Sequence, residues 1–170
     1  MHLIFSHGHV SSPASHKIRT LAPLAEAAGH TTEAIDYRDL RDDPAGRVER
    51  LCARLEKLGE PAVLVGSSMG GYVSVAAACR MPVQGLFLLA PAVYLNHRYP
   101  DVGLIEEHYP VRCNTVSVIH GWRDEVIPWQ NAQRFAEERR ADLHLLDTDH
   151  GMHSAIGQIA WLFQSFLKAI

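Results

Sequence analysis

The serine at position 68 has the surroundings of a catalytic nucleophile. Residues 66–70 read Gly-Ser-Ser-Met-Gly, the pattern G-x-S-x-G, between an apolar strand-like run and a helix-like run. A nucleophile on so tight a strand-to-helix turn has a strained backbone, and the residues two before and two after it must be small. Ser68 meets both requirements, whereas Ser67 has Val65 two positions before it. We therefore expect Ser68 to be the attacking residue.

Two other interpretations of this turn are a glycine turn that packs a helix on a sheet and a loop that binds phosphate. A Walker loop would need a lysine after its last glycine, and none follows here. The dinucleotide pattern G-x-G-x-x-G is also missing after the first strand, where residues 6–10 read Ser-His-Gly-His-Val. A helix that begins at Met69 would direct the backbone N–H of Met69 at a developing oxyanion.

A serine hydroxyl needs a base, and His150 has the best position among the 11 histidines. His150 directly follows the last predicted strand, so it lies at the carboxyl edge of the sheet, where sites of open parallel sheets occur. We expect His153 on the following helix. His144 falls inside a strand and His120 at a strand end, so we expect packing or loop roles for them.

Asp124 is the acid that we expect to orient the base. It follows the fifth predicted strand and precedes a helix, which places it at the same edge of the sheet. Glu125 is the adjacent alternative, while Asp147 and Asp149 are too close in sequence to His150 to orient its ring. The order along the chain is then nucleophile, acid, base.

Strand-like and helix-like segments alternate along the chain, which predicts a parallel sheet covered on both faces. The apolar runs 2–6, 31–36, 61–66, 83–90, 115–120 and 142–147 predict six strands. The segments 15–29, 44–59, 69–80, 129–140 and 152–169 predict helices, the first distorted at Pro23. Residues 91–114 are irregular, with a short helical candidate over 102–108.

Composition places the chain among soluble globular proteins. Its 170 residues suit one domain, 1–170, with 47% hydrophobic and 21% charged residues and a net charge of −3. No basic block exceeds Arg139-Arg140, so we expect no nucleic-acid partner. No apolar run approaches the ~20 residues of a membrane span, so we expect no membrane partner and a cytosolic location. Three separated cysteines support neither a disulfide framework nor a thiolate zinc site: Cys52, Cys79 and Cys113.

Four segments together resemble the α/β-hydrolase superfamily over nearly the whole chain. They are Ser6–His9 after the first strand, Gly66–Gly70, His120–Pro128 and Asp149–Gly151, in that order. The stretch His7–Pro13 is similar to the oxyanion loop of small bacterial esterase-like members of the superfamily.

The resemblance implies a minimal α/β-hydrolase fold with six parallel strands in the order 2-1-3-4-5-6 and helices on both faces. It also implies that the backbone N–H of His9 joins that of Met69 in an oxyanion hole. The antiparallel hairpin that opens many members is missing, because the His-Gly loop follows the first strand directly. Residues 91–114 are too few for a multi-helix cap.

The favoured function is a serine hydrolase that cleaves small carboxylic esters through an acyl-enzyme, with no cofactor and no metal. A thioesterase or amidase would use the same residues, and a non-catalytic binding member of the fold is a further alternative. A metal-dependent hydrolase is another alternative, because the pairs His7/His9 and His150/His153 have aspartates nearby. The H-E-x-x-H pattern of such enzymes is absent.

The segment 91–114 is the only candidate for a substrate-binding insertion at this edge. We expect His97, Tyr99, His108 and Tyr109 to line the cleft. The segment is polar and too short to close over a fatty chain, which favours a small ester as the substrate of a shallow, partly wet site. The sequence does not indicate the oligomeric state.

Overall fold

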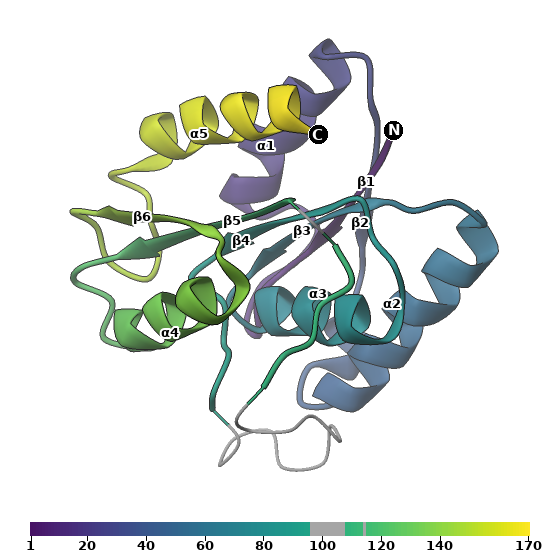
Figure 1. Ribbon diagram of the computed structural model, residues 1–170, viewed down its shortest axis with the longest axis horizontal. Coiled ribbons are helices and arrows are strands. Elements are labelled where there is room, and N and C mark those ends of the chain that lie inside the picture. The colour runs from purple at the N-terminus through teal and green to yellow at the C-terminus, as the bar shows by residue number, and fades with distance from the viewer. Residues whose placement is uncertain (96–107, 114) are drawn as a thin grey trace.

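The computed structural model describes residues 1–95, 108–113 and 115–170. Its centre is one parallel sheet of six strands in the order β2-β1-β3-β4-β5-β6 (Figure 1), which confirms the expected fold class and strand order. The strands are β1 (His2–Ser6), β2 (Thr31–Ile35), β3 (Val63–Ser67), β4 (Gly85–Leu89), β5 (Thr115–Gly121) and β6 (Asp142–Leu146).

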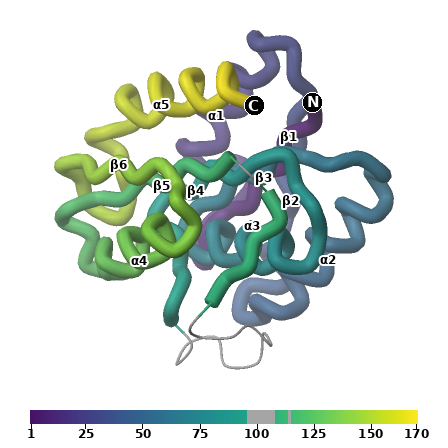
Figure 2. Tube along the Cα trace, in the orientation of Figure 1, coloured from purple at the N-terminus to yellow at the C-terminus, as the bar shows by residue number. Residues whose placement is uncertain are grey.

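Helices cover both faces of this sheet. Helices α1 (His16–Ala27) and α5 (Ile156–Ala169) lie side by side on one face, while α2 (Pro44–Leu58), α3 (Met69–Arg80) and α4 (Trp129–Arg139) cover the other (Figures 1 and 2). A short 3-10 helix, Arg38–Leu40, was not predicted. The covering explains why the central strands β3 and β4 consist of nearly continuous apolar residues.

Local sequence accounts for the helix ends. The Ser15 hydroxyl accepts a hydrogen bond from the Ile18 N–H at the start of α1, and the Asp43 carboxylate accepts one from the Gly46 N–H at the start of α2. Gly59 ends α2 with a φ of 74°, a conformation that glycine adopts without strain. Helix α1 continues through Pro23, where a distortion was expected.

The last helix begins later than expected. Met152 has a φ of 62° and its N–H donates to the Asp149 carbonyl, so a turn rather than a helix follows β6. His153 therefore lies in this turn and not on α5. The short helical candidate at 102–108 falls mostly outside the described residues, and His108 itself is not helical.

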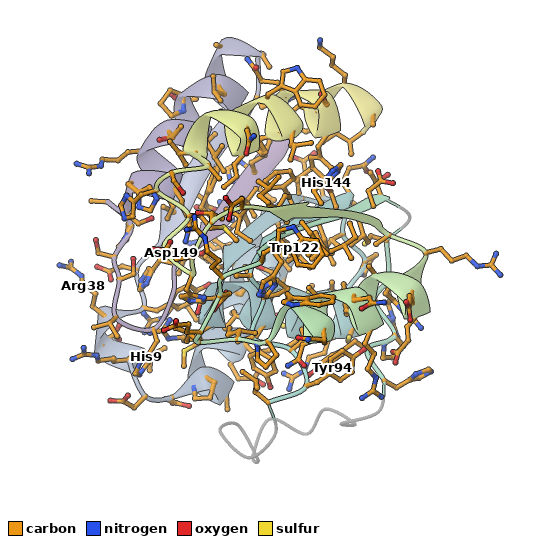
Figure 3. All side chains as sticks on the ribbon, turned by 90° about the vertical axis from the view of Figure 1, so that its left-hand side faces the viewer. His9, Arg38, Tyr94, Trp122, His144 and Asp149 are labelled. Atoms are coloured by element: carbon orange, nitrogen blue, oxygen red, sulfur yellow. The ribbon has the colours of Figure 1, made fainter. Side chains whose placement is uncertain are left out.

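The sheet directs six loops to one edge. Figure 3 looks onto this edge, where His9, Arg38, Tyr94, Trp122 and Asp149 come from the segments after β1, β2, β4, β5 and β6. Within the described ranges, every helix is too short or too polar to cross a membrane.

Candidate active site

Ser68 is the strained residue at the junction of β3 and α3. Its backbone has φ 56° and ψ −120°, a region that side chains rarely occupy. A methyl group on Gly66 would lie 2.4 Å from the Gly70 carbonyl oxygen, and one on Gly70 would lie 2.0 Å from that of Ser6. Both glycines are therefore required by close packing, which confirms the geometry expected of the turn.

The structure brings Ser68, Asp124 and His150 together from three different loops. Nε2 of His150 lies 3.1 Å from the Ser68 Oγ, and its Nδ1 lies 2.7 Å from the Asp124 Oδ2. An ionised carboxylate can only accept hydrogen bonds, so Nδ1 carries the proton and Nε2 is the acceptor. The Ser68 hydroxyl then donates to Nε2, as a general base requires. Neither Asp147 nor Asp149 takes the place of Asp124.

The Asp124 carboxylate is buried and accepts four hydrogen bonds. Its Oδ1 accepts from the N–H groups of Val126 and Ile127, each at 2.9 Å, and its Oδ2 accepts from His150 and, at 3.1 Å, from Nε2 of His120. Burial raises the pKa of Asp124, but the bonds from His120, His150 and Ile127 outweigh it and hold the pKa below its usual range. The acid is therefore ionised at neutral pH.

His120 is a residue of this site that sequence reasoning missed. It lies fully buried near the end of β5, and its Nε2 is 3.0 Å from the Ile127 carbonyl oxygen. Its Nδ1 is buried without a hydrogen-bond partner among the described residues. Nε2 faces two acceptor oxygens, one of the Asp124 carboxylate and one of the Ile127 carbonyl, so Nε2 carries a proton and donates it there. The sequence signal that could have revealed the contact between His120 and Asp124 is their separation of four residues, just after a strand.

The loop after β1 lies against Ser68. A methyl group on Gly8 would be 3.4 Å from the Ser68 Cβ. The buried Arg47 guanidinium donates to the carbonyl oxygens of His7, Gly8 and His9 at 3.3 to 3.4 Å. In a trans peptide the C=O and N–H point in opposite directions, so the His9 N–H faces away from Arg47. Arg47 was not anticipated from the sequence.

The His7 ring fixes the same loop from within. Its Nε2 accepts from the Tyr37 N–H at 3.0 Å, and its Nδ1 donates to the Gly8 carbonyl at 2.8 Å. Burial lowers the pKa of His7, which favours this neutral form. The backbone N–H of Met69, at the start of α3, has no acceptor among the described residues. It is available to a ligand at Ser68.

A pocket of about 470 Å³ opens on Ser68. Besides Ser68 and His150, its described lining comes from the loop after β1, the start of α1, the end of β3 and the segments after β4, β5 and β6: Gly8, His9, Val10, Ser11, Ser15, His16, Lys17, Ser67, Ala92, Leu95, Val126, Ile127, Gly151 and His153. His16 and Lys17 were not anticipated. The His16 ring stacks on that of His153 with the centroids 3.7 Å apart.

The expectation that His108 and Tyr109 line the cleft is wrong. Tyr109 is buried, where its ring packs edge-on against Phe135 and its hydroxyl accepts from the Tyr94 N–H. An aromatic ring gains more from this burial than from an exposed cleft. His108 is exposed, and neither residue lines the pocket. The other two, His97 and Tyr99, lie outside the described residues.

The histidine pairs do not form a metal site in the described ranges. No group of three or more His, Cys, Asp or Glu side chains there could hold an ion together. The His7 ring contacts Tyr37 and Gly8, whereas Nε2 of His9 pairs with the Asp42 carboxylate at 2.6 Å. The two rings of the first pair therefore have separate partners.

Sequence comparison relates the chain to a family and to mammalian enzymes. Residues 2–103 match the uncharacterised protein family UPF0227. The palmitoyl-protein thioesterase ABHD10 of mouse mitochondria is 22% identical over 85% of this chain and 72% of its own length. The bovine protein is also 22% identical, and the match covers 79% of this chain but 60% of the bovine one.

Solved structures show the same fold. A protein assigned to the α/β-hydrolase superfamily from Xanthomonas campestris pv. campestris is 31% identical, with a TM-score of 0.82 over 99% of both chains. Mouse ABHD10 is 23% identical with a TM-score of 0.83, covering 99% of this chain and 90% of that one. Est1E from Butyrivibrio proteoclasticus with bound ferulic acid is 15% identical with a TM-score of 0.88, covering 99% and 88%.

Proposed function

The chain belongs to the UPF0227 family and to the α/β-hydrolase superfamily, and on this basis we propose that it is a serine hydrolase of small carboxylic esters. The observation that carries the proposal is the continuous hydrogen-bonded series from Ser68 through His150 to Asp124. The arrangement supplies a nucleophile, a base and an acid that fixes the tautomer of the base.

In the proposed reaction the Ser68 Oγ attacks the ester carbonyl carbon while its proton passes to Nε2 of His150. The carbonyl oxygen becomes an oxyanion, which the N–H groups of Met69 and His9 stabilise. As the tetrahedral intermediate collapses, the bond to the alkoxide breaks and His150 gives its proton to that oxygen. Water then attacks the acyl-enzyme in the same way, which releases the acid and restores Ser68.

Asp124 stabilises the imidazolium that forms on His150, and His120 acts as a positioning residue behind it. Because His120 donates to the same carboxylate oxygen as His150, it fixes the orientation of the carboxylate and favours its ionised form. Arg47 and His7 have a corresponding role in the oxyanion loop, whose carbonyl groups they hold.

The pocket supports a small acyl group. Its apolar side chains are few and form a short wall, while the other described lining residues are glycines, serines, histidines and one lysine; the apolar ones are Val10, Ala92, Leu95, Val126 and Ile127. Each methylene removed from water contributes roughly 0.8 kcal/mol, and methylenes beyond this wall stay in water. We therefore expect acetyl to butyryl esters to be the best simple substrates, with specificity falling beyond about six acyl carbons.

A thioesterase is the second candidate, because the ABHD10 relatives are palmitoyl-protein thioesterases. The decisive experiment measures kcat/KM for p-nitrophenyl esters and for matching thioesters from two to sixteen acyl carbons, with Ser68→Ala as the control. The proposal expects a maximum at short acyl esters that disappears in Ser68→Ala. A maximum at ten or more carbons, or turnover of thioesters alone, would contradict it.

A further inference from the structure

Lys17 carries a positive charge beside the nucleophile that no carboxylate of the described residues pairs with. Its ammonium donates to the Ser67 Oγ at 3.2 Å and to the His150 carbonyl oxygen at 3.3 Å. Both acceptors are neutral, and an ammonium has three N–H donors. One donor therefore has no acceptor in the described ranges, at a point where the side chain lines the pocket.

The energetics of this lysine favour an anionic partner. Burial lowers the pKa of Lys17 to about 8, although the longer-range fields of Asp124 and Asp149 raise it. The group is therefore mostly charged at neutral pH. A largely enclosed charge without a partner costs free energy, which a bound anion would recover.

The surroundings of Lys17 have the same electrostatic character. The described lining of the pocket includes four serines and four histidines but no carboxylate, although the chain as a whole has a net charge of −3. The neighbouring hollow beyond Val126 does contain Glu125 and Asp149, together with Arg123. An anion is therefore favoured only on the side of the pocket formed by α1.

The apolar part of the pocket lies on the other side of the sheet. Leu95 and Ile127 belong to the hydrophobic core that includes α3, whereas Lys17 is in the first turn of α1, which packs on the opposite face. Ser68 lies between the two. A substrate that fills both parts has a hydrocarbon portion and a charged end, with the ester between or near them.

Resting on the proposed function, we propose that the substrates of this enzyme are esters with a carboxylate on a short arm, which Lys17 binds. A carboxylate fits better than a phosphate, because the ammonium offers a single unassigned N–H and the described lining contains no arginine. The His16 ring, at the first position of α1, stacks on the His153 ring, and both rings line the pocket beside Lys17.

The test compares two esters that differ in charge alone: monomethyl glutarate and the ester in which its free carboxylate is an amide. Alkyl esters are used because an activated aryl ester would be cleaved by its own carboxylate. We expect kcat/KM at pH 7 to be at least about tenfold higher for the acid, with the ratio falling to about one in Lys17→Met. Arg19→Met, which removes an exposed cation from the same helix, should leave the ratio unchanged.

Three results would overturn the proposal: a wild-type preference for the amide, equal turnover of the two esters by the wild type, or a Lys17→Met variant that slows both esters equally and keeps their ratio. The third result would mean that Lys17 only holds Ser67 and the His150 loop. Lys17→Arg, which retains the charge, should keep the preference for the acid.

If the enzyme turns over neither ester, a binding measurement still tests whether Lys17 binds a carboxylate. Calorimetry with glutarate and Ser68→Ala should show binding that is lost when Lys17→Met is added, and its absence in Ser68→Ala would refute the site. Turnover of the amide ester without selectivity would refute the carboxylate site but not the hydrolase. Failure of all esters together with an unreactive Ser68 would refute the hydrolase.

Discussion

Replacing Asp124 by asparagine changes one oxygen atom to an NH₂ group at the most densely bonded point of the site. Oδ1 accepts two backbone N–H groups, so the asparagine oxygen stays there and its NH₂ faces His150 and His120. Both rings present an N–H to that position. Two donor-to-donor contacts replace two hydrogen bonds, and both rings must shift to the other tautomer or rotate.

The loss can be worked out from these two contacts. A buried donor left unsatisfied costs about 1–3 kcal/mol, so two of them cost roughly 2–6 kcal/mol. If this free energy is lost in the transition state, kcat falls by a factor of about 30 to 3 × 10⁴, since each 1.36 kcal/mol is tenfold. The upper end matches the ~10⁴-fold loss known for triads in which the wrong tautomer forms. His120 makes the effect larger than in a site where the acid has one histidine.

The assay is steady-state hydrolysis of p-nitrophenyl acetate at pH 7.5 on variants shown to be folded by circular dichroism. Glu125→Gln is the matched control, because Glu125 is the exposed neighbour of Asp124 and should retain activity within about twofold. Activity above a tenth of wild type in Asp124→Asn would refute this reasoning. Greater damage from Glu125→Gln would assign the acid to position 125.

Three further outcomes follow from the same contacts. His120→Phe removes one of the hydrogen bonds that orient the Asp124 carboxylate and hold its pKa below the usual range, so kcat should fall about tenfold with KM nearly unchanged; an unchanged kcat, or a rise in KM alone, would contradict a positioning role. Gly70→Ala should lower the free energy of unfolding in urea by about 1–3 kcal/mol or more, because its methyl group would lie 2.0 Å from the Ser6 carbonyl oxygen. Gly157 is the second residue of α5, as Gly70 is of α3, but it has open space around it, so Gly157→Ala should be neutral or stabilising. The preference for the acid over the amide ester should fall as the pH rises through about 8, where Lys17 loses its charge in the field of Asp124, Asp149, His16 and His153; a ratio constant from pH 6.5 to 9.5 would contradict it.

The sheet and the nucleophile turn could be predicted because their signals are local. Alternation of apolar strands with helices fixed the parallel layers, and the small residues of Gly66–Gly70 indicated a close approach that the structure contains. The strand order came from the resemblance to a superfamily. The turn at Met152 was not predicted, since residues 152–155 also fit the first turn of a helix.

The supporting residues could not be predicted because their partners are distant in sequence. Lys17 contacts His150 across 133 positions, and Arg47 contacts His7 across 40. No periodicity in a single sequence reports such contacts. The polar character of residues 91–114 was misleading at Tyr109, because Tyr94 supplies the donor that lets the hydroxyl be buried.

The central claim is that His150 activates Ser68 as a nucleophile, and labelling with a fluorophosphonate tests it most directly. Mass spectrometry of the intact protein should show one adduct, and peptide mapping should place it on Ser68. The label should persist in Ser67→Ala, should be absent in Ser68→Ala, and should form at least 10²-fold more slowly in His150→Ala. An unlabelled wild-type protein, or an adduct on Ser67 or any other residue, would contradict the claim.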